Sequence, residues 1–313
     1  MWKTYRRLQQ RGILSINRRN SDYVLRYNPR RLYPLVDDKL KTKKLAIAAG
    51  IAVPSLYGLI ETERQIAQFS ELVAPYTDFV IKPAHGAGGD GIIVITGRVF
   101  DRYRQINGKL LTQHDIAYHL SCLISGAYSL GGHVDYALIE RRVIVDPVFA
   151  SISHEGVPDI RIICLLGYPA MAMVRLPTRL SGGKANLHQG AIGVGIDLAT
   201  GLTAGGVHHN DLVDYHPDTL NSTLNIQVPY WDDMLSIAAR CYELTGLGYL
   251  GVDIVLDQEH GPLMLELNAR PGLNIQIANR MGIVSRYLLI EEEHATRGPC
   301  AVADRVAFSK ALT

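Results

Sequence analysis

Residue types that bind metal ions and phosphates gather at the end of an apolar run, in the segment GPLMLELNARPGL (261–273). Successive side chains of a strand point to opposite faces, so Glu266 and Asn268 should share one face with Met264. Carboxylate and carboxamide oxygens are hard ligands that suit Mg²⁺. The planar cation of Arg270, two residues beyond Asn268, suits phosphate oxygens. The segment therefore indicates metal-assisted phosphate chemistry.

A second acid is expected beside this segment. In YLGVDIVLD (249–257) the apolar residues alternate and leave Asp253 on the opposite face. The linking QEHG is a plausible tight turn, so the two strands should pair antiparallel, with Asp253 near Glu266 or Asn268. Like charges held this close repel unless a cation lies between them, which again favours Mg²⁺. Taken alone, the hairpin could equally present a solvent-exposed polar face.

A glycine-rich loop is the second candidate site. The strand-like FVIKP contains Lys82 and is followed directly by AHGAGGDG (84–91). The backbone N–H groups of such a loop can cradle phosphates. Its spacing is neither that of a P-loop nor that of a Rossmann turn, and by itself it could be an ordinary turn. The order of Lys-Pro, glycine loop and a later D…ExN pair is more specific than any one part.

These residues must be positioned by a mixture of helices and strands, because both apolar periodicities occur along the chain. The expected helices cover 41–50, 62–74, 114–128, 231–244 and 276–289. Gly50 should end the first helix and Thr62 should cap the second. The expected strands cover 78–83, 91–96, 135–143, 249–257 and 262–268, with a hairpin over 159–176 that turns at 167–169.

The composition is that of an ordinary globular protein. The chain has 313 residues, of which 47% are apolar and 20% charged, a length that favours two or more lobes. The N-terminus lacks the apolar stretch of a signal peptide, and the longest apolar run is too short to span a bilayer. We therefore expect a cytoplasmic protein that is not transmembrane. The four cysteines are scattered, so we expect reduced thiols.

Charge is distributed unevenly along the chain. Residues 1–44 contain thirteen lysines and arginines against three aspartates, although the net charge of the whole chain is only +2. Such a basic segment could contact an anionic partner or membrane face, or pack on the acidic remainder of its own chain. No helix-turn-helix spacing or aromatic RNA-binding motif accompanies it, so no nucleic-acid partner is expected.

Together these motifs resemble the ATP-grasp superfamily, and within it the RimK-type alpha-L-glutamate ligases, from about Asp38 to Leu273. The resemblance implies an α+β fold in which two subdomains clamp ATP. It also implies a set of Mg²⁺ ligands, for which Mn²⁺ is an alternative ion: Asp253, Glu266 and Asn268.

The same resemblance implies nucleotide contacts. DDKLKTKK resembles the segment whose lysine, here Lys39, reaches the ATP phosphates, and VIKP resembles the strand whose lysine, Lys82, contacts the adenine side and the α-phosphate. HGAGGDG resembles the mobile loop that closes over the phosphates. Its implied nucleotide contacts are His85, Gly86, Gly88 and Gly89. LIERRV is similar to the hinge that reads the adenine edge through its backbone, at Glu140, Arg141, Arg142 and Val143.

Two further segments imply catalytic residues. DIRIICLLG is similar to the D-I-R strand of the family, which makes Asp159 a ribose contact and Arg161 a phosphate or acylphosphate contact. KANLHQGA (184–191) is similar to the N-L-H-R-G-G loop of glutamate ligases, with Gln189 where those enzymes carry arginine. The implied catalytic residues are Arg161, Arg270, Lys184 and His188, and Asn186 is an implied nucleotide contact.

The domain organisation follows from these positions. We expect a basic N-terminal arm at 1–38, an ATP-grasp subdomain with the first lysine and the lid at 39–140, a C-terminal ATP-grasp subdomain with the metal site at 141–295, and a tail at 296–313. Most relatives carry a Rossmann-like domain ahead of the first lysine, whereas only 38 residues precede Lys39.

The expected function is an ATP-dependent carboxylate–amine ligase that forms an amide bond through an acylphosphate. Its partners would be a carboxylate donor and an amine acceptor, the acceptor being large or presented by another protein, and the chain could form a homo-oligomer. Two alternatives stay open at this point. One is an ATP-grasp kinase that phosphorylates a small molecule, and the other is a catalytically silent nucleotide-binding regulatory protein.

Overall fold

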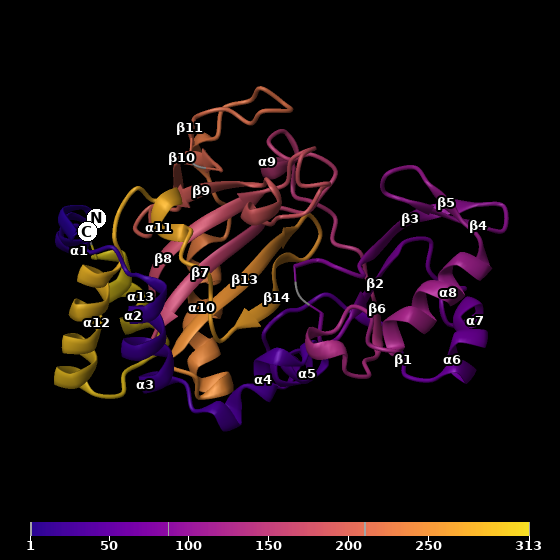
Figure 1. Cartoon of the computed structure of the whole chain (residues 1–313), viewed down its shortest axis with the longest axis horizontal. Helices are drawn as coiled ribbons and strands as arrows, with labels where there is room; N and C mark the ends of the chain where they lie inside the picture. The colour runs from indigo at the N-terminus through magenta and orange to yellow at the C-terminus, as the bar shows by residue number, and fades with distance from the viewer. Residues whose placement is uncertain (1, 87, 210, 313) are drawn as a thin grey trace. The chain divides into compact units, whose positions relative to one another are not determined.

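The chain forms two compact units in the computed structural model, which describes residues 2–86, 88–209 and 211–312 (Figure 1). Unit 1 contains Met1–Asp37, Leu45–Ala52 and Ile144–Thr313, and unit 2 contains Asp38–Lys44 and Val53–Val143. Helix α5 (Lys39–Ala48) begins in unit 2 and ends in unit 1. The division is therefore not the linear one expected from the sequence.

Unit 2 is built on a six-stranded antiparallel sheet with the strand order β1-β6-β2-β3-β4-β5. Its strands are β1 (Leu56–Ile60), β2 (Phe79–Pro83), β3 (Ile93–Val99), β4 (Arg102–Gln105), β5 (Leu110–Leu111) and β6 (Ala137–Glu140). Its other helices are α6 (Glu63–Ala67), α7 (Phe69–Leu72), α8 (Gln113–Ile124) and the 3₁₀ turn η3 (Leu130–Gly132). An aromatic core of Phe69, Phe79 and Tyr103, packed edge to face, joins the helices to the sheet.

The helix predicted over 62–74 is interrupted. Thr62 does cap it, because its side chain and that of Gln65 form a capping box. At Gln68 the backbone leaves the helical region, with φ −94° and ψ 2°, and α7 starts anew. The break aims the ring of Phe69 into the aromatic core, a tertiary requirement that helical periodicity does not reveal.

Unit 1 is built on an eight-stranded sheet with the order β11-β10-β9-β8-β7-β13-β14 (Figure 1). The eighth strand, β12, pairs with β10. Its strands are β7 (Asp159–Leu165), β8 (Tyr168–Leu176), β9 (Ile192–Ile196), β10 (Leu202–His208), β11 (Asp211–Val213), β12 (Leu224–Gln227), β13 (Tyr249–Asp257) and β14 (Gly261–Asn268). The hairpin predicted over 159–176 is present and turns at Leu166-Gly167, where Gly167 has a φ of +80°. The antiparallel pairing predicted for β13 and β14 is confirmed.

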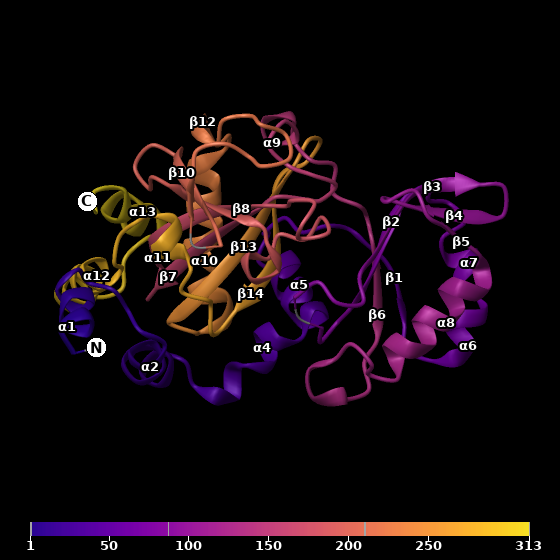
Figure 2. The same ribbon diagram turned by 45° about the horizontal axis from the view of Figure 1, so that its top comes forward.

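Helices cover the sheet of unit 1. The longest, α10 (Trp231–Thr245), packs on β7, β8, β13 and β14 (Figure 2). Further helices of this unit lie C-terminal to residue 144: α9 (Pro147–Ala150), η4 (Leu187–Gln189), α11 (Ile275–Ala278), α12 (Val284–Arg297) and α13 (Val302–Lys310). A core cluster joins Ile163, Met171 and Tyr249 of the sheet to Tyr287 and Ile290 of α12.

The first 37 residues are part of this unit and do not form the separate arm expected from their charge. They contain the short helices α1 (Trp2–Gln10), α2 (Ile16–Arg18), η1 (Arg19–Val24), α3 (Leu25–Tyr27), η2 (Arg30–Leu32) and α4 (Pro34–Asp37). Leu14 and Tyr23 lie in the core cluster. The buried side chain of Asn28 donates to the carbonyls of Tyr249 and Ala269 and accepts from the N–H of Tyr249. The arginines are therefore the outer surface of an integral segment.

The C-terminal helices also differ from the prediction. A single helix over 276–289 is wrong, because α11 ends at Ala278 and α12 starts at Val284. Arg280 between them has a left-handed φ of 54°, and a Cβ on Gly282 would lie 2.1 Å from the backbone of Gly12. This close approach of the N-terminal segment forces the break. The residues expected as a tail fold into α13.

Candidate functional site

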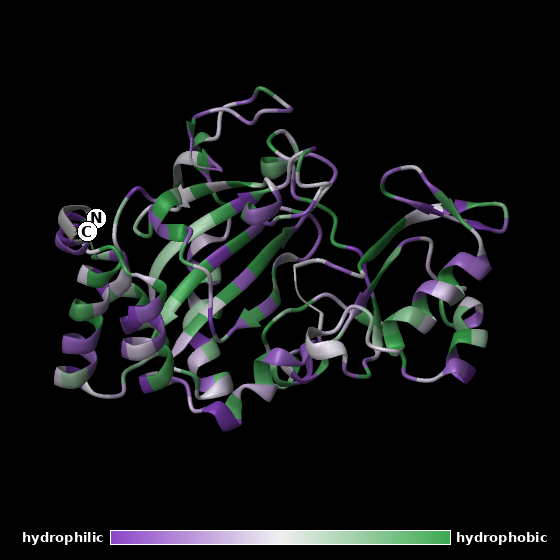
Figure 3. Ribbon diagram, in the orientation of Figure 1, coloured by the Kyte–Doolittle hydropathy of each residue, from purple (hydrophilic) through white to green (hydrophobic). Residues whose placement is uncertain are grey.

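A layer of charged side chains crosses four neighbouring strands of unit 1. The register pairs Arg161 of β7 with Asp253 of β13, and Asp253 with Glu266 of β14. Arg175 of β8 lies opposite Asp159 of β7. Directly paired residues of antiparallel strands project from the same face, so these side chains share one face. Figure 3 shows the resulting hydrophilic bands within otherwise apolar strands.

Asp253 is the centre of this layer. Arg161 donates from Nε to Asp253 Oδ1 at 2.7 Å and from Nη2 to Oδ2 at 2.5 Å. Arg175 Nη2 and Asn268 Nδ2 donate to the same Oδ2 at 2.9 and 3.2 Å. Burial alone would raise the pKa of Asp253, but the charges and hydrogen bonds of the two arginines outweigh it and hold the pKa below its usual range. The predicted neighbours Arg161, Asp253 and Asn268 are thus in contact.

Arg175 was missed by the sequence interpretation. Its guanidinium pairs with both oxygens of the Asp159 carboxylate as well as with Asp253. Asp159 is therefore buried against an arginine, a partner different from the ribose expected for it. A signal was present in the sequence, because Asp159 and Arg175 are equidistant from Gly167 in the predicted hairpin.

The side chains of this layer are chemically suited to bind a divalent cation. Asp253, Glu266 and Asn268 supply oxygen ligands from one face of two paired strands. The guanidinium groups of Arg161 and Arg175 now neutralise Asp253. A metal ion bound there would take over part of that role and leave the arginines available to other anions.

Unit 2 contains a second cluster, of two lysines around one buried acid. Lys82 Nζ lies 2.7 Å from Glu140 Oε2, and Lys43 Nζ lies 3.1 Å from Glu140 Oε1. All three side chains are buried. Burial lowers the pKa of Lys43 to about 8, although Glu140 acts in the opposite direction. Two lysines share one carboxylate, so the cluster carries a surplus positive charge that suits an anionic ligand.

The glycine loop is tied to the same unit at its first residues. Asp135 accepts from the backbone N–H of His85 at 3.1 Å and lies 2.7 Å from His85 Nδ1. Ser129 donates to the second oxygen of Asp135, and Gly86 forms a β-bridge with Ser129. Lys39 Nζ donates to the carbonyl of Gly86 at 2.5 Å. The predicted residues Lys39 and Gly86 are therefore in contact, and His85 beside them is held by the buried Asp135, which the sequence interpretation did not include.

The tip of the loop has a backbone that requires glycine. Gly88, Gly89 and Gly91 have φ values of 67°, 79° and 75°. This left-handed region is open to glycine and costly for other residues. A Cβ on Gly91 would also lie 2.6 Å from the ring of Tyr128. Successive backbone conformations of this kind can turn N–H groups toward an anion.

The predicted hinge, 140–143, has partners of its own. The side chain of Glu140 forms ion pairs with Lys43 and Lys82, and the N–H of Arg141 donates to the carbonyl of Ser55 at 2.8 Å. Arg142 pairs with Asp78 at 2.9 Å, and Val143 is buried. The N–H of Arg141 is thus engaged within unit 2. Contact of this segment with an adenine ring stays a prediction.

The loop that contains the predicted catalytic residues 184–188 follows β8 in unit 1. Asn186 accepts from the N–H of His188 at 3.0 Å and so caps η4. Lys184 is half-buried and the ring of His188 is exposed. The loop is fixed at its end, where His208 Nε2 lies 3.1 Å from the carbonyl of Gly190.

Arg270, predicted to be catalytic, lies just beyond β14. Its guanidinium stands over the ring of Tyr33 at 5.1 Å, a cation–π contact with the N-terminal segment. Arg19 donates to the carbonyl of Pro271 at 2.9 Å. The N-terminal segment therefore positions the chain that follows the predicted metal ligands.

A different acidic group has the spacing of metal ligands without lying in the charged layer. This group consists of Asp257, Glu259 and His260. One potential ligand atom from each of these three residues lies within 4.8 Å of the other two, which is close enough to share a metal ion. Asp257 accepts from the N–H groups of Glu259 and His260, each at 3.0 Å. This pattern closes the turn between β13 and β14 and explains the group without a metal ion.

Across 2–86, 88–209 and 211–312, no helix combines the length and the apolar character needed to cross a bilayer. The four cysteines are all free thiols, as predicted.

The two α+β units, the charged layer and the glycine loop define a protein of the ATP-grasp class. A sequence profile described as sugar-transfer associated ATP-grasp matches residues 18–292, and the chain belongs to that family. The sequence-based expectation of an ATP-grasp protein related to the alpha-L-glutamate ligases is confirmed.

Curated relatives share this relationship at low identity. The chain is 25% identical over 269 residues to a probable alpha-L-glutamate ligase of Klebsiella pneumoniae, covering 84% of this chain and 66% of the relative. It is 23% identical over 270 residues to a ribosomal protein bS6–L-glutamate ligase of Salmonella newport, with the same coverage of 84% and 66%. The chain therefore spans about two thirds of the length of these relatives.

Solved structures of ATP-grasp ligases are more distant. D-cycloserine synthetase DcsG matches with a TM-score of 0.46 and 14% identity, covering 85% of this chain and 72% of its own. The ligase PsnB in complex with a minimal precursor matches with a TM-score of 0.47 and 15% identity, covering 83% and 60%.

Proposed function

We propose that the chain is an ATP-dependent carboxylate–amine ligase. The observation that carries the proposal is the charged layer, in which Asp253 is held by Arg161 and Arg175 and lies opposite Glu266. Acids and guanidinium groups on one sheet face suit a reaction in which a metal-bound phosphoryl group meets a carboxylate. Membership of the ATP-grasp family and the names of the curated relatives support the same chemistry.

The residues divide by role. Asp253, Glu266 and Asn268 would hold Mg²⁺, which when bound with ATP neutralises phosphate charge. Lys82 and Lys39 would donate to phosphate oxygens, and the glycine loop would supply backbone N–H groups. For Lys39 this requires a change of partner, from the carbonyl of Gly86 to a phosphate.

Carboxylate activation explains why several cations are needed. A carboxylate is a poor electrophile, so its oxygen would attack the γ-phosphorus of ATP, with ADP leaving, to form an acylphosphate. An amine would then attack the acyl carbon, and phosphate would leave as the amide forms. Arg161 and Arg175 would counter the negative charge on both leaving groups, and Arg270 and Lys184 are further cations of unit 1 proposed for this task. His188, exposed on its loop, is proposed to orient the loop or accept the amine proton.

The names of the relatives and of the family support a choice of substrate classes. The curated relatives are named as glutamate ligases, and one of them acts on ribosomal protein bS6. The family description adds sugar transfer. We therefore propose an amino acid or sugar acid as the carboxylate and a peptide, protein or amino sugar as the amine. Gln189 replaces the arginine of the glutamate ligases, so glutamate is one candidate among these acids.

The test is ADP release across a panel of acids, each measured with and without amines. The panel contains amino acids and glucuronate as acids, and amino acids, short peptides and glucosamine as amines. A ligase should release ADP at a sustained rate only when an acid and an amine are both present. Release that needs a single small molecule would instead indicate the kinase. ATP binding without release in any mixture would indicate the regulatory protein.

A further inference from the structure

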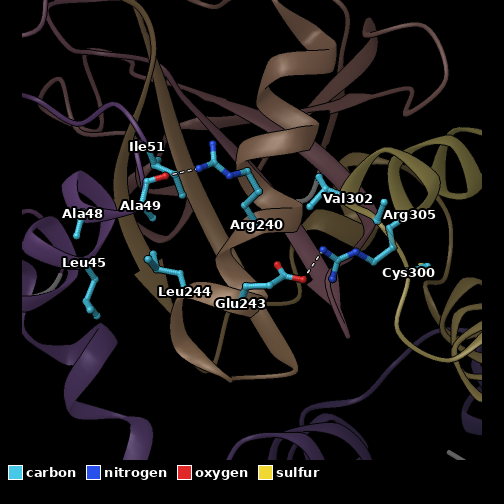
Figure 4. Close-up of a pocket in the computed structure, with 11 residues that line it drawn as sticks. Leu45, Ala48, Ala49, Ile51, Arg240, Glu243, Leu244, Cys300, Val302 and Arg305 are labelled. Atoms are coloured by element: carbon cyan, nitrogen blue, oxygen red, sulfur yellow. Dashed lines mark hydrogen bonds and ion pairs between the residues drawn. The ribbon is translucent and has the colours of Figure 1, made fainter.

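A cavity of about 620 Å³ lies within unit 1, apart from the charged layer (Figure 4). Three segments form its walls: residues 45–51 at the end of α5, residues 240–244 of α10, and residues 300–305 at the start of α13. Leu45, Leu244 and Val302 give it apolar walls. Two arginines, Arg240 and Arg305, also line it, so the cavity combines an apolar surface with positive charge.

Arg305 is almost completely buried, with 3% of its surface exposed. The fold makes room for its guanidinium at the β7–β8 turn, where a Cβ on Gly167 would lie 2.1 Å from Arg305 Nη1. Its Nε is buried and makes no hydrogen bond within the described residues. Burying a guanidinium whose donors are unused costs free energy. An anion that pairs with it removes this cost, and the recovered free energy favours binding of the anion.

The anion that now faces Arg305 is weakly held. Glu243 Oε1 lies 2.5 Å from Arg305 Nη2, but the contact lacks the direction of a hydrogen bond, and the Glu243 side chain is 56% exposed (Figure 4). An exposed glutamate gains little from such a pair because water solvates it well and its side chain loses rotamer freedom. Glu243 can therefore swing into solvent at low cost and give up its place to another carboxylate.

We propose that this cavity binds a small monocarboxylate with an apolar tail. Its carboxylate would replace that of Glu243 at Arg305, with Arg240 as a second cation at the rim. The tail would lie against Leu45, Leu244 and Val302. A neutral molecule of the same shape that displaced Glu243 would leave the guanidinium unpaired, and a cation would be repelled, so the negative charge is required.

The experiment uses the full chain and hexanoate as the probe, with hexanol as the uncharged molecule of matched length. Cys300 lines the cavity, so its alkylation by iodoacetamide, followed by mass spectrometry, reports occupancy. Cys122 of α8, in unit 2, is the internal reference. We expect hexanoate to protect Cys300 in a saturable way without changing Cys122, and hexanol to have no effect. Equal protection of both cysteines, or no protection, overturns the proposal.

Two variants separate a ligand site from a structural ion pair. Glu243→Gln removes the competing carboxylate and should tighten hexanoate binding by roughly two- to fivefold, the factor that corresponds to an exposed ion pair. Hexanoate should also raise its melting temperature more than that of the native chain. Ala48→Phe should fill the cavity and abolish protection, and Glu292→Gln on α12 is the exposed control. Unchanged or weaker hexanoate binding by Glu243→Gln would show that Arg305 serves only the ion pair.

Discussion

Arg161 and Asp253 lie directly opposite one another in β7 and β13, and the guanidinium of Arg161 donates to both carboxylate oxygens at 2.7 and 2.5 Å. The acids of the proposed metal site are therefore not left to repel each other before a metal ion binds. Arg161 compensates the buried Asp253, and Arg175 adds a second contact. The site is built as a charge network, and its members should depend on one another.

The first prediction concerns the two proposed metal ligands. Asp253→Asn and Glu266→Gln should both abolish ADP formation, because the oxygen charge that would hold Mg²⁺ is lost. Asp253→Asn should also lower the free energy of unfolding, by about 3 kcal/mol, since it leaves two largely but not fully buried arginines undercompensated. Glu266→Gln should cost less. Urea unfolding monitored by circular dichroism measures the difference.

The control variant is Asp211→Asn, because Asp211 on β11 is an exposed acid. Asp257→Asn would be an unsuitable control, because Asp257 closes the β13–β14 turn. If either ligand variant kept near-normal ADP formation, the metal assignment would be wrong. If Asp253→Asn were as stable as the native chain, the charge network would not carry the stability assigned to it.

A second prediction concerns Lys82. Lys82→Met keeps the alkyl stem and removes the charge, so the affinity for ATP should fall by roughly 1.5–3 kcal/mol, the scale of a hydrogen bond to a charged group. Lys44→Met, at an exposed position of α5, should leave it unchanged. Calorimetric titration with a non-hydrolysable ATP analogue measures both. Equal affinities in the two variants would place Lys82 in a purely structural role.

Asp135 should act as a positioning residue for the glycine loop. In Asp135→Asn one oxygen becomes an N–H donor, so the contacts from His85 and Ser129 cannot all be kept. Hydrogen exchange at the His85 amide should accelerate while β2 stays protected. The ATP affinity should fall by about tenfold, as for one hydrogen bond to a charged group.

Asp101→Asn, at an exposed turn, is the matched control for Asp135→Asn. Faster exchange throughout unit 2 would mean that Asp135 supports the fold in general. Unchanged exchange at His85 would mean that it does not anchor the loop.

A pH dependence follows from Lys43. Burial lowers its pKa to about 8 in the folded chain, against an ordinary value of 10.5. Below pH 8 the amine is protonated in both states. Between about pH 8 and 10.5 the unfolded chain binds more protons than the folded one, so the free energy of unfolding should rise with pH in this window.

The comparison with Lys43→Met isolates this contribution. The native chain should gain on the order of 1–3 kcal/mol relative to Lys43→Met between pH 7.5 and 10. Lys109→Met, at an exposed position, should follow the native chain. Parallel pH profiles for the native chain and Lys43→Met would contradict the lowered pKa.

The sequence was most informative where chain neighbours form the structure. The hairpin of β13 and β14 was predictable with its facing acids, because a tight turn and strict alternation determine which side chains meet. The strand that contains Lys82 and the glycine loop after it were also predictable, because the two segments are adjacent in the sequence.

Contacts between distant segments were not accessible in this way. The basic N-terminal residues were expected to form an arm, but Leu14, Tyr23 and Asn28 anchor them in the core of unit 1. The pairing of Lys43 with Glu140 and of His85 with Asp135 depends on the strand order of unit 2. Hydrophobic periodicity indicates which face of a helix or strand is buried, but it does not identify the distant residues that pack against that face.

The most direct test of the central claim is the fate of carboxylate oxygen during turnover. An acid from the ADP-releasing panel is labelled with ¹⁸O in both carboxylate oxygens and is supplied with ATP, Mg²⁺ and the amine that supports release. Activation through an acylphosphate predicts that each amide formed transfers one ¹⁸O to inorganic phosphate, detected by mass spectrometry. Sustained ADP release with amide formation but unlabelled phosphate would contradict the proposed mechanism.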